Sequence, residues 1–306
     1  MNILVTGANG QLGREMRLTA KESSHHYIFT DVAPAEGLET ILLDITDRNA
    51  VEQMVSEEQV GAIVNCAAWT DVDACETDSV MAAKAERINA LAPAILAQAM
   101  RDVNGLLVHI STDYVFGLEP YNTPCNEEQK GTPTGVYGHS KLRGEMVIRN
   151  SGVQYLILRT SWLYSEYGRN FCRTMMKLTA EKPQVNVVFD QTGTPTYALD
   201  LAQAITTILE RESWRGNTGI YNYSNEGVCS WYDFACEIIR LSGVQAQVTP
   251  CTSAQYKQMN PASTNRPAWS ALDNRMLRCT AGDPVRPWQQ ALECFFAHWD
   301  GENGMK

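Results

Sequence analysis

Residues 2–13 read NILVTGANGQLG, a short apolar run followed by three glycines at intervals of three residues. The apolar run predicts a buried strand, and the amphipathic segment at about 11–22 predicts a helix directly after it. Gly7, Gly10 and Gly13 allow a tight turn, and backbone N–H groups at the start of a helix can bind a pyrophosphate. The stretch therefore predicts the strand, turn and helix that open a dinucleotide-binding fold.

Apolar runs and helical segments continue to alternate through the first half of the chain. Strands are expected at 27–30, 40–43, 60–68, 105–111 and 155–162, and helices at 47–58 and 79–103. This alternation predicts an α/β protein with a Rossmann-type, doubly wound parallel sheet. Residues 1–165 would form the cofactor domain, with elements near 190–224 returning to it. Residues 166–306 would form mainly a smaller C-terminal substrate-binding lobe.

The composition of the 306-residue chain excludes several classes of function. The net charge is −10 and no run of Lys or Arg could follow a phosphate backbone, so nucleic acid is not expected as a partner. No leader or membrane-spanning segment is recognised, which predicts a cytoplasmic protein without a membrane partner. The nine cysteines form no CxxC pair and the five histidines no HxH or HExxH pattern, so no metal site is expected.

Turns at the ends of the predicted strands supply further candidates for the cofactor site. Asp31 lies 18 residues after Gly13, where its carboxylate can accept hydrogen bonds from the adenosine ribose. Such a carboxylate favours NADH, although a nearby basic residue would permit NADPH. Residues 44–45 are candidates for the adenine ring and 67–69 for the nicotinamide side, while each could also simply end its strand. The candidate cofactor residues are Gly7, Gly10, Gln11, Leu12, Gly13, Asp31, Asp44, Ile45, Ala67, Ala68, Trp69, Tyr137 and Lys141.

Tyr137 and Lys141 carry the clearest chemical signal outside the glycine stretch. Residues four apart lie on one face of a helix, so the ammonium could lower the pKa of the phenol from about 10 towards neutrality. A phenol tuned in this way can exchange a proton with a sugar oxygen. The alternative is an exposed helix face that happens to carry both residues. Thr112 ends the predicted strand 25 residues before Tyr137, at the sheet edge where such folds bind ligands.

Five motifs occur in a fixed order along the chain: AAWTDVDACE at 67–76, STDYVF at 111–116, RTSWLY at 159–164, QTGTPT at 191–196 and RPAWSALD at 266–273. Together with the glycines, Thr112, Tyr137 and Lys141, they resemble the extended short-chain dehydrogenase/reductase family. Within that family the chain is similar, over essentially its full length, to the dTDP-4-dehydrorhamnose reductases.

The resemblance implies hydride transfer from NADH or NADPH to the C4 ketone of a dTDP-4-keto-6-deoxy sugar, giving dTDP-L-rhamnose. Tyr137 would donate the proton, Lys141 would hold Tyr137 at a useful pKa, and Thr112 would bond the carbonyl oxygen. The residues implied at the substrate are Thr70, Thr112, Asp113, Trp162 and Arg266. Arg266 would bind the diphosphate, with a surface ion pair as its alternative. Trp162 could equally fill a core.

The resemblance also leaves alternatives. A nucleotide-sugar 4,6-dehydratase would carry Glu where this chain has Tyr114, so dehydration is disfavoured. A 4-epimerase shares the Thr, Tyr and Lys set and retains its NAD, and a non-catalytic regulatory subunit is a third reading. Some members bind Mg²⁺ at a dimer contact. Glu15 matches one such position, but the partner position is Leu199 with Asp200 beside it, which counts against the metal. A monomer or a homodimer is expected.

Overall fold

The computed structural model describes residues 1–118, 122–281 and 285–299. Within these residues, seven strands form the central sheet: β1 (Asn2–Thr6), β2 (His26–Asp31), β3 (Ile41–Leu42), β4 (Val60–Asn65), β5 (Leu106–Thr112), β6 (Gln154–Thr160) and β11 (Gly219–Asn222). Their order is β11-β6-β5-β4-β1-β2-β3, and all neighbours pair in parallel. The order reverses between β1 and β4, which is the point where such sheets bind ligands. The predicted doubly wound α/β fold is confirmed.

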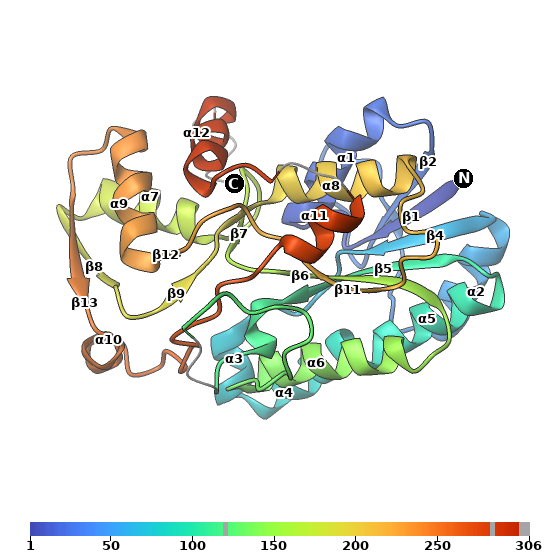
Figure 1. Cartoon of the computed structure of the whole chain (residues 1–306), viewed down its shortest axis with the longest axis horizontal. Helices are drawn as coiled ribbons and strands as arrows, with labels where there is room; N and C mark the ends of the chain where they lie inside the picture. The colour runs from blue at the N-terminus through green and yellow to red at the C-terminus, as the bar shows by residue number, and fades with distance from the viewer. Residues whose placement is uncertain (119–121, 282–284, 300–306) are drawn as a thin grey trace.

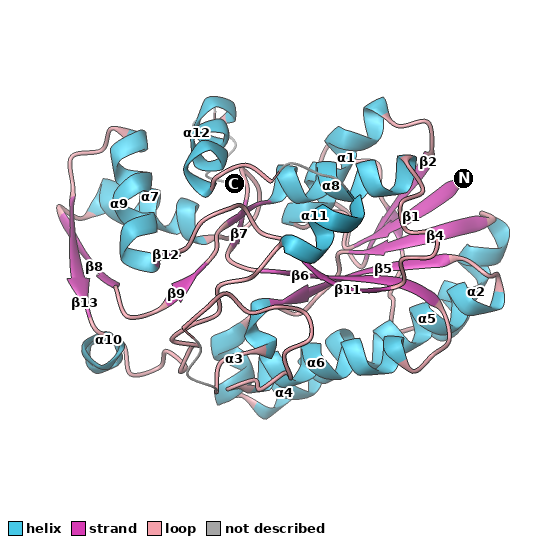
Figure 2. Cartoon of the chain, viewed as in Figure 1, coloured by secondary structure: helices cyan, strands magenta, loops and turns pink. Residues whose placement is uncertain are grey.

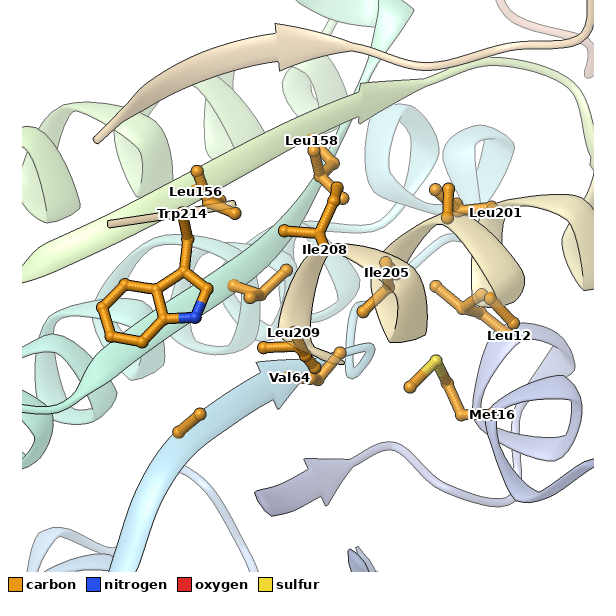
Figure 3. Packing of buried hydrophobic residues seen from close by; sticks show 14 of the residues in the cluster. Leu12, Met16, Val64, Leu156, Leu158, Leu201, Ile205, Ile208, Leu209 and Trp214 are labelled. Carbon is orange, nitrogen blue, oxygen red and sulfur yellow. The ribbon is translucent and has the colours of Figure 1, made fainter. Parts of the chain in front are cut away.

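Helices cover both faces of this sheet (Figure 1). One face carries α1 (Gln11–Thr19), α8 (Ala198–Glu210) and α11 (Arg275–Ala281), and the other α2 (Arg48–Glu57), α5 (Ala92–Asp102) and α6 (Val136–Arg149). Successive residues of β1 point to opposite faces, because Ile3 and Val5 join the first cluster and Leu4 the second. Figure 3 shows Leu12 and Met16 of α1 packing with α8 in the first cluster.

The C-terminal lobe has its own apolar cluster around α7 (Phe171–Glu181), α9 (Trp231–Ser242) and α12 (Trp288–His298). Three two-stranded pairs accompany these helices (Figure 2). They join β8 (Gln184–Val188) to β13 (Gln247–Cys251), β9 (Thr192–Gly193) to β12 (Cys229–Ser230), and β7 (Leu163–Tyr164) to β10 (Thr196–Tyr197). α10 (Ser253–Met259) follows β13. α11, although late in the sequence, packs on the main sheet through Leu277.

The segment 79–103, expected as one helix, is divided in three. α4 (Ser79–Glu86) leads into a π-helical turn, η2 (Arg87–Leu91), and then into α5. Pro93 near the start of α5 has no N–H, so the regular bonding of an α-helix cannot run through this point. Shorter pieces are α3 (Val72–Thr77) and the 3₁₀ turns η1 (Ala20–Glu22) and η3 (Asp113–Val115). No helix of the described residues is both long and apolar enough to span a membrane.

Candidate functional site

In the glycine turn after β1, Gly7 and Gly13 lie too close to neighbouring backbone for any side chain at these positions. Gly7 has a φ of +66°, and a Cβ there would lie 2.6 Å from the backbone nitrogen of Ala67. A Cβ on Gly13 would lie 2.5 Å from Cα of Ala8. α1 begins just after Gly10, which caps the helix without any side-chain hydrogen bond. The turn is therefore a cradle whose shape and helix dipole fit a bound diphosphate.

Two predicted cofactor residues in α1 direct their side chains elsewhere. Leu12 is buried in the apolar cluster on one face of the sheet. The Gln11 carboxamide oxygen accepts a hydrogen bond from Asn170 Nδ2 at 3.0 Å, which joins α1 to the segment before α7. Leu12 can therefore meet a cofactor only through its backbone groups.

Asp31 ends β2 beside the glycine turn, as expected. Its carboxylate accepts hydrogen bonds from the backbone N–H of Asn9 at 3.0 Å and of Val32 at 2.8 Å. Arg17 is close enough to interact electrostatically with Asp31, and its guanidinium lies over the ring of Phe29. The turn thus carries both a carboxylate for ribose hydroxyls and a cation that could meet a 2′-phosphate.

Asp44 and Ile45 follow β3 but are occupied by local contacts. The Asp44 carboxylate accepts bonds from the backbone N–H of Thr46 at 2.8 Å and from its hydroxyl at 2.7 Å, and Ile45 is buried in the core. These contacts hold the pKa of Asp44 below its usual value despite partial burial. The turn is therefore shaped by its own hydrogen bonds, and contact of these two residues with the adenine ring stays a prediction.

Ala67, Ala68 and Trp69 follow β4 at the same edge as the glycine turn. Asn89 in the π-helical turn clamps this segment, because its side chain accepts from the N–H of Trp69 at 2.8 Å and donates to the carbonyl of Trp69 at 2.9 Å. Asn89 also donates to the Ser140 hydroxyl in α6 at 3.1 Å. The irregular helical turn thus ties the segment after β4 to the helix that carries Tyr137.

Thr112 and Tyr137 meet at the carboxyl end of β5. The Thr112 side chain lies close enough to the Tyr137 hydroxyl to act against the rise in its pKa, and both residues are buried. The ring of Tyr114 packs edge-on against the ring of Tyr137, with centroids 5.7 Å apart. Burial raises the pKa of Tyr137 above its ordinary value, so the phenol keeps its proton at neutral pH.

Lys141 lies one turn after Tyr137, and the spacing predicts that its ammonium lowers the pKa of the phenol. The pKa of Tyr137 is instead raised by burial. Its Nζ group donates to the carbonyl oxygen of Ile110 at 2.6 Å and lies 3.4 Å from Nε2 of His109. Burial lowers the pKa of Lys141 itself to about 8. The prediction fails because desolvation dominates both groups and the lysine side chain is directed at β5.

Asp113 is buried next to Thr112 and joins β5 to the distant segment 266–273. Its carboxylate accepts from the Ser270 hydroxyl at 2.5 Å and from the Thr112 hydroxyl at 3.1 Å. Burial is the largest influence on this carboxyl and raises its pKa to about 7, although both hydroxyl contacts oppose the shift.

Asp113→Asn is expected to stabilise the protein above pH 7 by a few degrees in Tm, and to have little effect below about pH 4. An unfolded Asp titrates near 3.9, while the folded carboxyl titrates at about 7. The folded state thus binds the proton more tightly, and stability falls as pH rises between these values. Thermal unfolding across this range measures the effect; a benefit of Asp113→Asn that shrinks with rising pH would contradict it.

Arg266, in the segment 266–273, pairs with Asp73 at 3.2 Å. It also lies near the hydroxyl of Tyr114, whose ring packs edge-on against the ring of Tyr137. About a third of its side chain is exposed, so the guanidinium retains access to solvent. The ion pair that we considered as an alternative is therefore present, in a position beside Tyr114. Thr70 is exposed nearby, after Trp69.

Trp162 lies between the two parts of the molecule and has a strained backbone, with a φ of +49°. Its ring stacks on Trp231, with centroids 3.5 Å apart and planes 8° apart. A Cβ on Gly193 would lie 2.6 Å from the ring, so this glycine is needed for the ring to fit. The ring packs against the apolar cluster of the lobe and is only partly buried.

The carboxylates considered for Mg²⁺ do not fit a metal. Glu15 is buried near Glu166, and burial together with Glu166 raises the pKa of Glu15 to about 9, so this carboxyl keeps its proton at neutral pH. Asp200 is neutralised by the guanidinium of Arg286, with Nε at 2.8 Å from Oδ2. Across the described ranges, no group of three or more His, Cys, Asp or Glu side chains is arranged to hold a metal. Protons and an arginine already balance these charges.

Several buried polar residues around the site were not anticipated. Glu145 accepts from the Ser111 hydroxyl at 2.6 Å and forms a two-point ion pair with Arg159, at 2.9 and 2.7 Å. His109 and Asn65 are hydrogen-bonded to each other inside the sheet. A polar residue within an otherwise apolar strand, as in VGAIVN or LLVHIST, was the signal that could have indicated them.

Comparison with known proteins gives concordant matches. The sequence model of the family described as RmlD substrate binding domain matches residues 1–300. A crystal structure of a dTDP-4-dehydrorhamnose reductase from Clostridium acetobutylicum is 40% identical, with a TM-score of 0.87, and the match covers 97% of this chain and 99% of that one.

Two further relatives have similar coverage. The dTDP-4-dehydrorhamnose reductase of Bacillus anthracis, solved in complex with NADP, is 35% identical with a TM-score of 0.82 over 97% of this chain and 98% of that one. A probable dTDP-4,6-dihydroxy-2-methyloxan-3-one 4-ketoreductase of Streptomyces antibioticus is 38% identical over 95% of this chain and 93% of its own length. Since the family match extends over almost the whole sequence, the chain belongs to the RmlD substrate binding domain family.

Proposed function

We propose that the chain reduces the C4 ketone of dTDP-4-dehydro-6-deoxy-L-mannose (dTDP-4-dehydrorhamnose) to give dTDP-L-rhamnose, with NADPH or NADH as the reductant. The observation that carries this proposal is the placement of the buried Thr112 and Tyr137 side chains next to each other at the sheet edge beside the glycine turn. The names of the relatives at 35 and 40% identity support the same reaction. Reduction of a ketone needs a hydride donor and a proton donor at one carbon–oxygen bond, and the site offers a place for both.

The reduced nicotinamide, when bound, supplies the hydride to C4. In our proposal the Tyr137 phenol donates its proton to the oxygen, which becomes a hydroxyl group. Its raised pKa suits this role, because the phenol holds its proton until an alkoxide, a stronger base, develops beside it. Thr112 donates a hydrogen bond to the same oxygen and stabilises the charge that develops on it.

The rest of the substrate would bind between the sheet edge and the segment 266–273. We assign the diphosphate to Arg266, whose planar guanidinium can bond two phosphate oxygens and already lies beside Tyr114. Asp113, Thr70 and Trp162 would contact the sugar or its nucleotide from the surrounding turns.

Both nicotinamide cofactors are compatible with the residues around the adenosine ribose. Asp31 can accept bonds from ribose hydroxyls, and Arg17 can neutralise a 2′-phosphate. The NADP complex of the Bacillus anthracis relative supports use of the phosphorylated form. The free thiols of all nine cysteines favour a reducing compartment, and we place the protein in the cytoplasm as a monomer or homodimer.

The proposal is tested by following oxidation of NADPH and NADH with dTDP-4-keto-6-deoxyglucose, with and without a 3,5-epimerase that supplies the L-lyxo epimer. Oxidation that requires the epimerase is the expected result. Tight retention of NAD without net oxidation would favour a 4-epimerase. Binding of cofactor without turnover of any keto sugar would favour a regulatory subunit.

Thr112→Val is expected to lower kcat by about 10–100-fold, less than loss of the Tyr137 hydroxyl. The variant removes one hydrogen bond of ~1–3 kcal/mol to a charged transition state and keeps the volume of the side chain. Steady-state kinetics with the epimerised substrate measures the loss. A greater loss than for Tyr137→Phe would contradict the roles proposed for these two residues.

A further inference from the structure

A chain of buried polar groups crosses the sheet beneath Lys141. Thr6 on β1, Asn65 on β4 and His109 on β5 are each at most 1% exposed, and Lys141 on α6 is 2% exposed. The Thr6 hydroxyl donates to Asn65 Oδ1 at 2.7 Å, and Asn65 Nδ2 lies 2.9 Å from Nδ1 of His109. Nε2 of the same ring lies 3.4 Å from Lys141 Nζ. The reaction proposed above uses none of the first three residues.

The orientation of the Asn65 amide is fixed by its neighbours. The backbone N–H of Ala67, which can only donate, bonds the oxygen Oδ1 at 3.2 Å. A flipped amide would bring its NH₂ group against this N–H. Nδ2 therefore faces His109, and because an amide NH₂ can only donate, Nδ1 of His109 must accept.

This orientation fixes the tautomer of His109. Burial lowers the pKa of His109 well below its usual 6.5, so the ring is neutral. A neutral ring whose Nδ1 accepts carries its proton on Nε2. That N–H points at Lys141 Nζ. An ammonium cannot accept a hydrogen bond, but a free amine can, while still donating to the carbonyl oxygen of Ile110.

We propose that the Nε2–H group of His109 donates a hydrogen bond to Lys141 Nζ and thereby favours the free amine of this lysine. His109 is then a positioning residue that acts through Lys141, and Asn65 selects the tautomer that makes this possible. The meaning for turnover rests on the proposed function: Lys141 can bind and release a proton near neutral pH beside Tyr137. The pKa of Lys141, lowered to about 8, agrees with the geometry.

The other groups that face Lys141 do not change this arrangement. Glu145 on α6 would favour the ammonium, but its carboxylate is bound by Arg159 and Ser111. Cys66 after β4 is kept as a neutral thiol, because burial raises its pKa to about 12. Tyr137 also keeps its proton.

The test uses the full-length protein and two NMR observables that need no turnover. The ¹⁵N shifts of His109 report which ring nitrogen carries the proton, and a ¹³C titration of the lysine Cε carbons reports the pKa of Lys141. The signals are assigned from His109→Gln and Lys141→Arg. We expect a proton on Nε2 and a Lys141 pKa well below the ordinary value of about 10.4.

Substitutions then separate the contributions of Asn65 and His109 to the pKa of Lys141. Asn65→Asp replaces the donor by an acceptor of the same shape, so the His109 proton should move to Nδ1 and the Lys141 pKa should rise by about one unit or more. His109→Leu removes the donor and should raise the Lys141 pKa similarly. His109→Gln is the matched control, because its amide can accept from Asn65 and donate to Lys141, and it should leave the pKa near the wild-type value.

A wild-type His109 with its proton on Nδ1 would overturn the proposal. So would a Lys141 pKa that stays unchanged in both Asn65→Asp and His109→Leu. The outcome is independent of the proposed reaction, since a protein that failed to reduce any keto sugar would still give the same spectra.

Discussion

Tyr137→Phe is expected to lower kcat by ~100–10,000-fold while the Kd for NADPH stays within about a factor of two. The variant removes the proton donor but keeps the ring, which still packs edge-on against Tyr114. Because the hydroxyl is proposed to act in the transition state, the loss should fall on kcat rather than on KM. Steady-state oxidation of NADPH gives the rate, and quenching of tryptophan fluorescence gives the Kd.

Tyr221→Phe is a matched control for this variant. Tyr221 is also a buried tyrosine, but it lies on β11, where its hydroxyl donates to the carbonyl of Asn217 at 2.8 Å. Its loss should affect stability and leave kcat unchanged. Near-normal turnover of Tyr137→Phe would remove Tyr137 from the mechanism, whereas equal loss in both variants would indicate a general effect of truncating buried tyrosines.

Glu145→Leu is expected to lower the free energy of unfolding by ~3–5 kcal/mol. It leaves the Arg159 guanidinium buried without its anion, since the two side chains are only 1 and 4% exposed. The pair also holds α6 against β5 and β6, because Glu145 contacts Ser111, the residue before Thr112. Urea unfolding measures the stability change, and a lower kcat in the remaining folded protein would show that α6 has moved.

Two comparisons test whether burial of the charges causes the loss of stability in Glu145→Leu. Glu212→Leu breaks the exposed ion pair with Arg215 and should cost far less stability than Glu145→Leu, because solvent screens the exposed charges. The double variant Glu145→Leu, Arg159→Met removes both buried charges and should cost less than Glu145→Leu alone. A cost for Glu145→Leu as small as that of the exposed pair would refute the role of the buried charge.

The sheet could be predicted because its signal is local. Strands such as β1 and β4 are buried on both faces, so they appear as continuous apolar runs, and each is followed by a turn and a helix. The long helix at 79–103 was only partly right, because the π-helical turn depends on Pro93 and on Asn89, whose partners lie in other elements. The short β3 reflects its exposed edge position, which the pattern at 40–43 did not reveal.

The candidate site was predictable at the level of residue types and not at the level of contacts. The spacing of Tyr137 and Lys141 correctly places both on α6, but it cannot show that the lysine bonds β5 or that burial controls both pKa values. The contact of Ser270 with Asp113 joins residues 157 positions apart, and no local pattern encodes it. Such contacts depend on how the C-terminal segment returns to the sheet.

The edge strand β11 has a consequence for how this protein is made. It pairs with β6, yet it follows β6 only after the chain has passed through α7 and β8 of the lobe. During synthesis the N-terminal part emerges from the ribosome first. The edge of β6 that pairs with β11 therefore stays unpaired until residue 222 has been synthesised. A truncated mRNA that ends before this codon would yield chains that can pair with one another along β6. Such chains would be prone to aggregate.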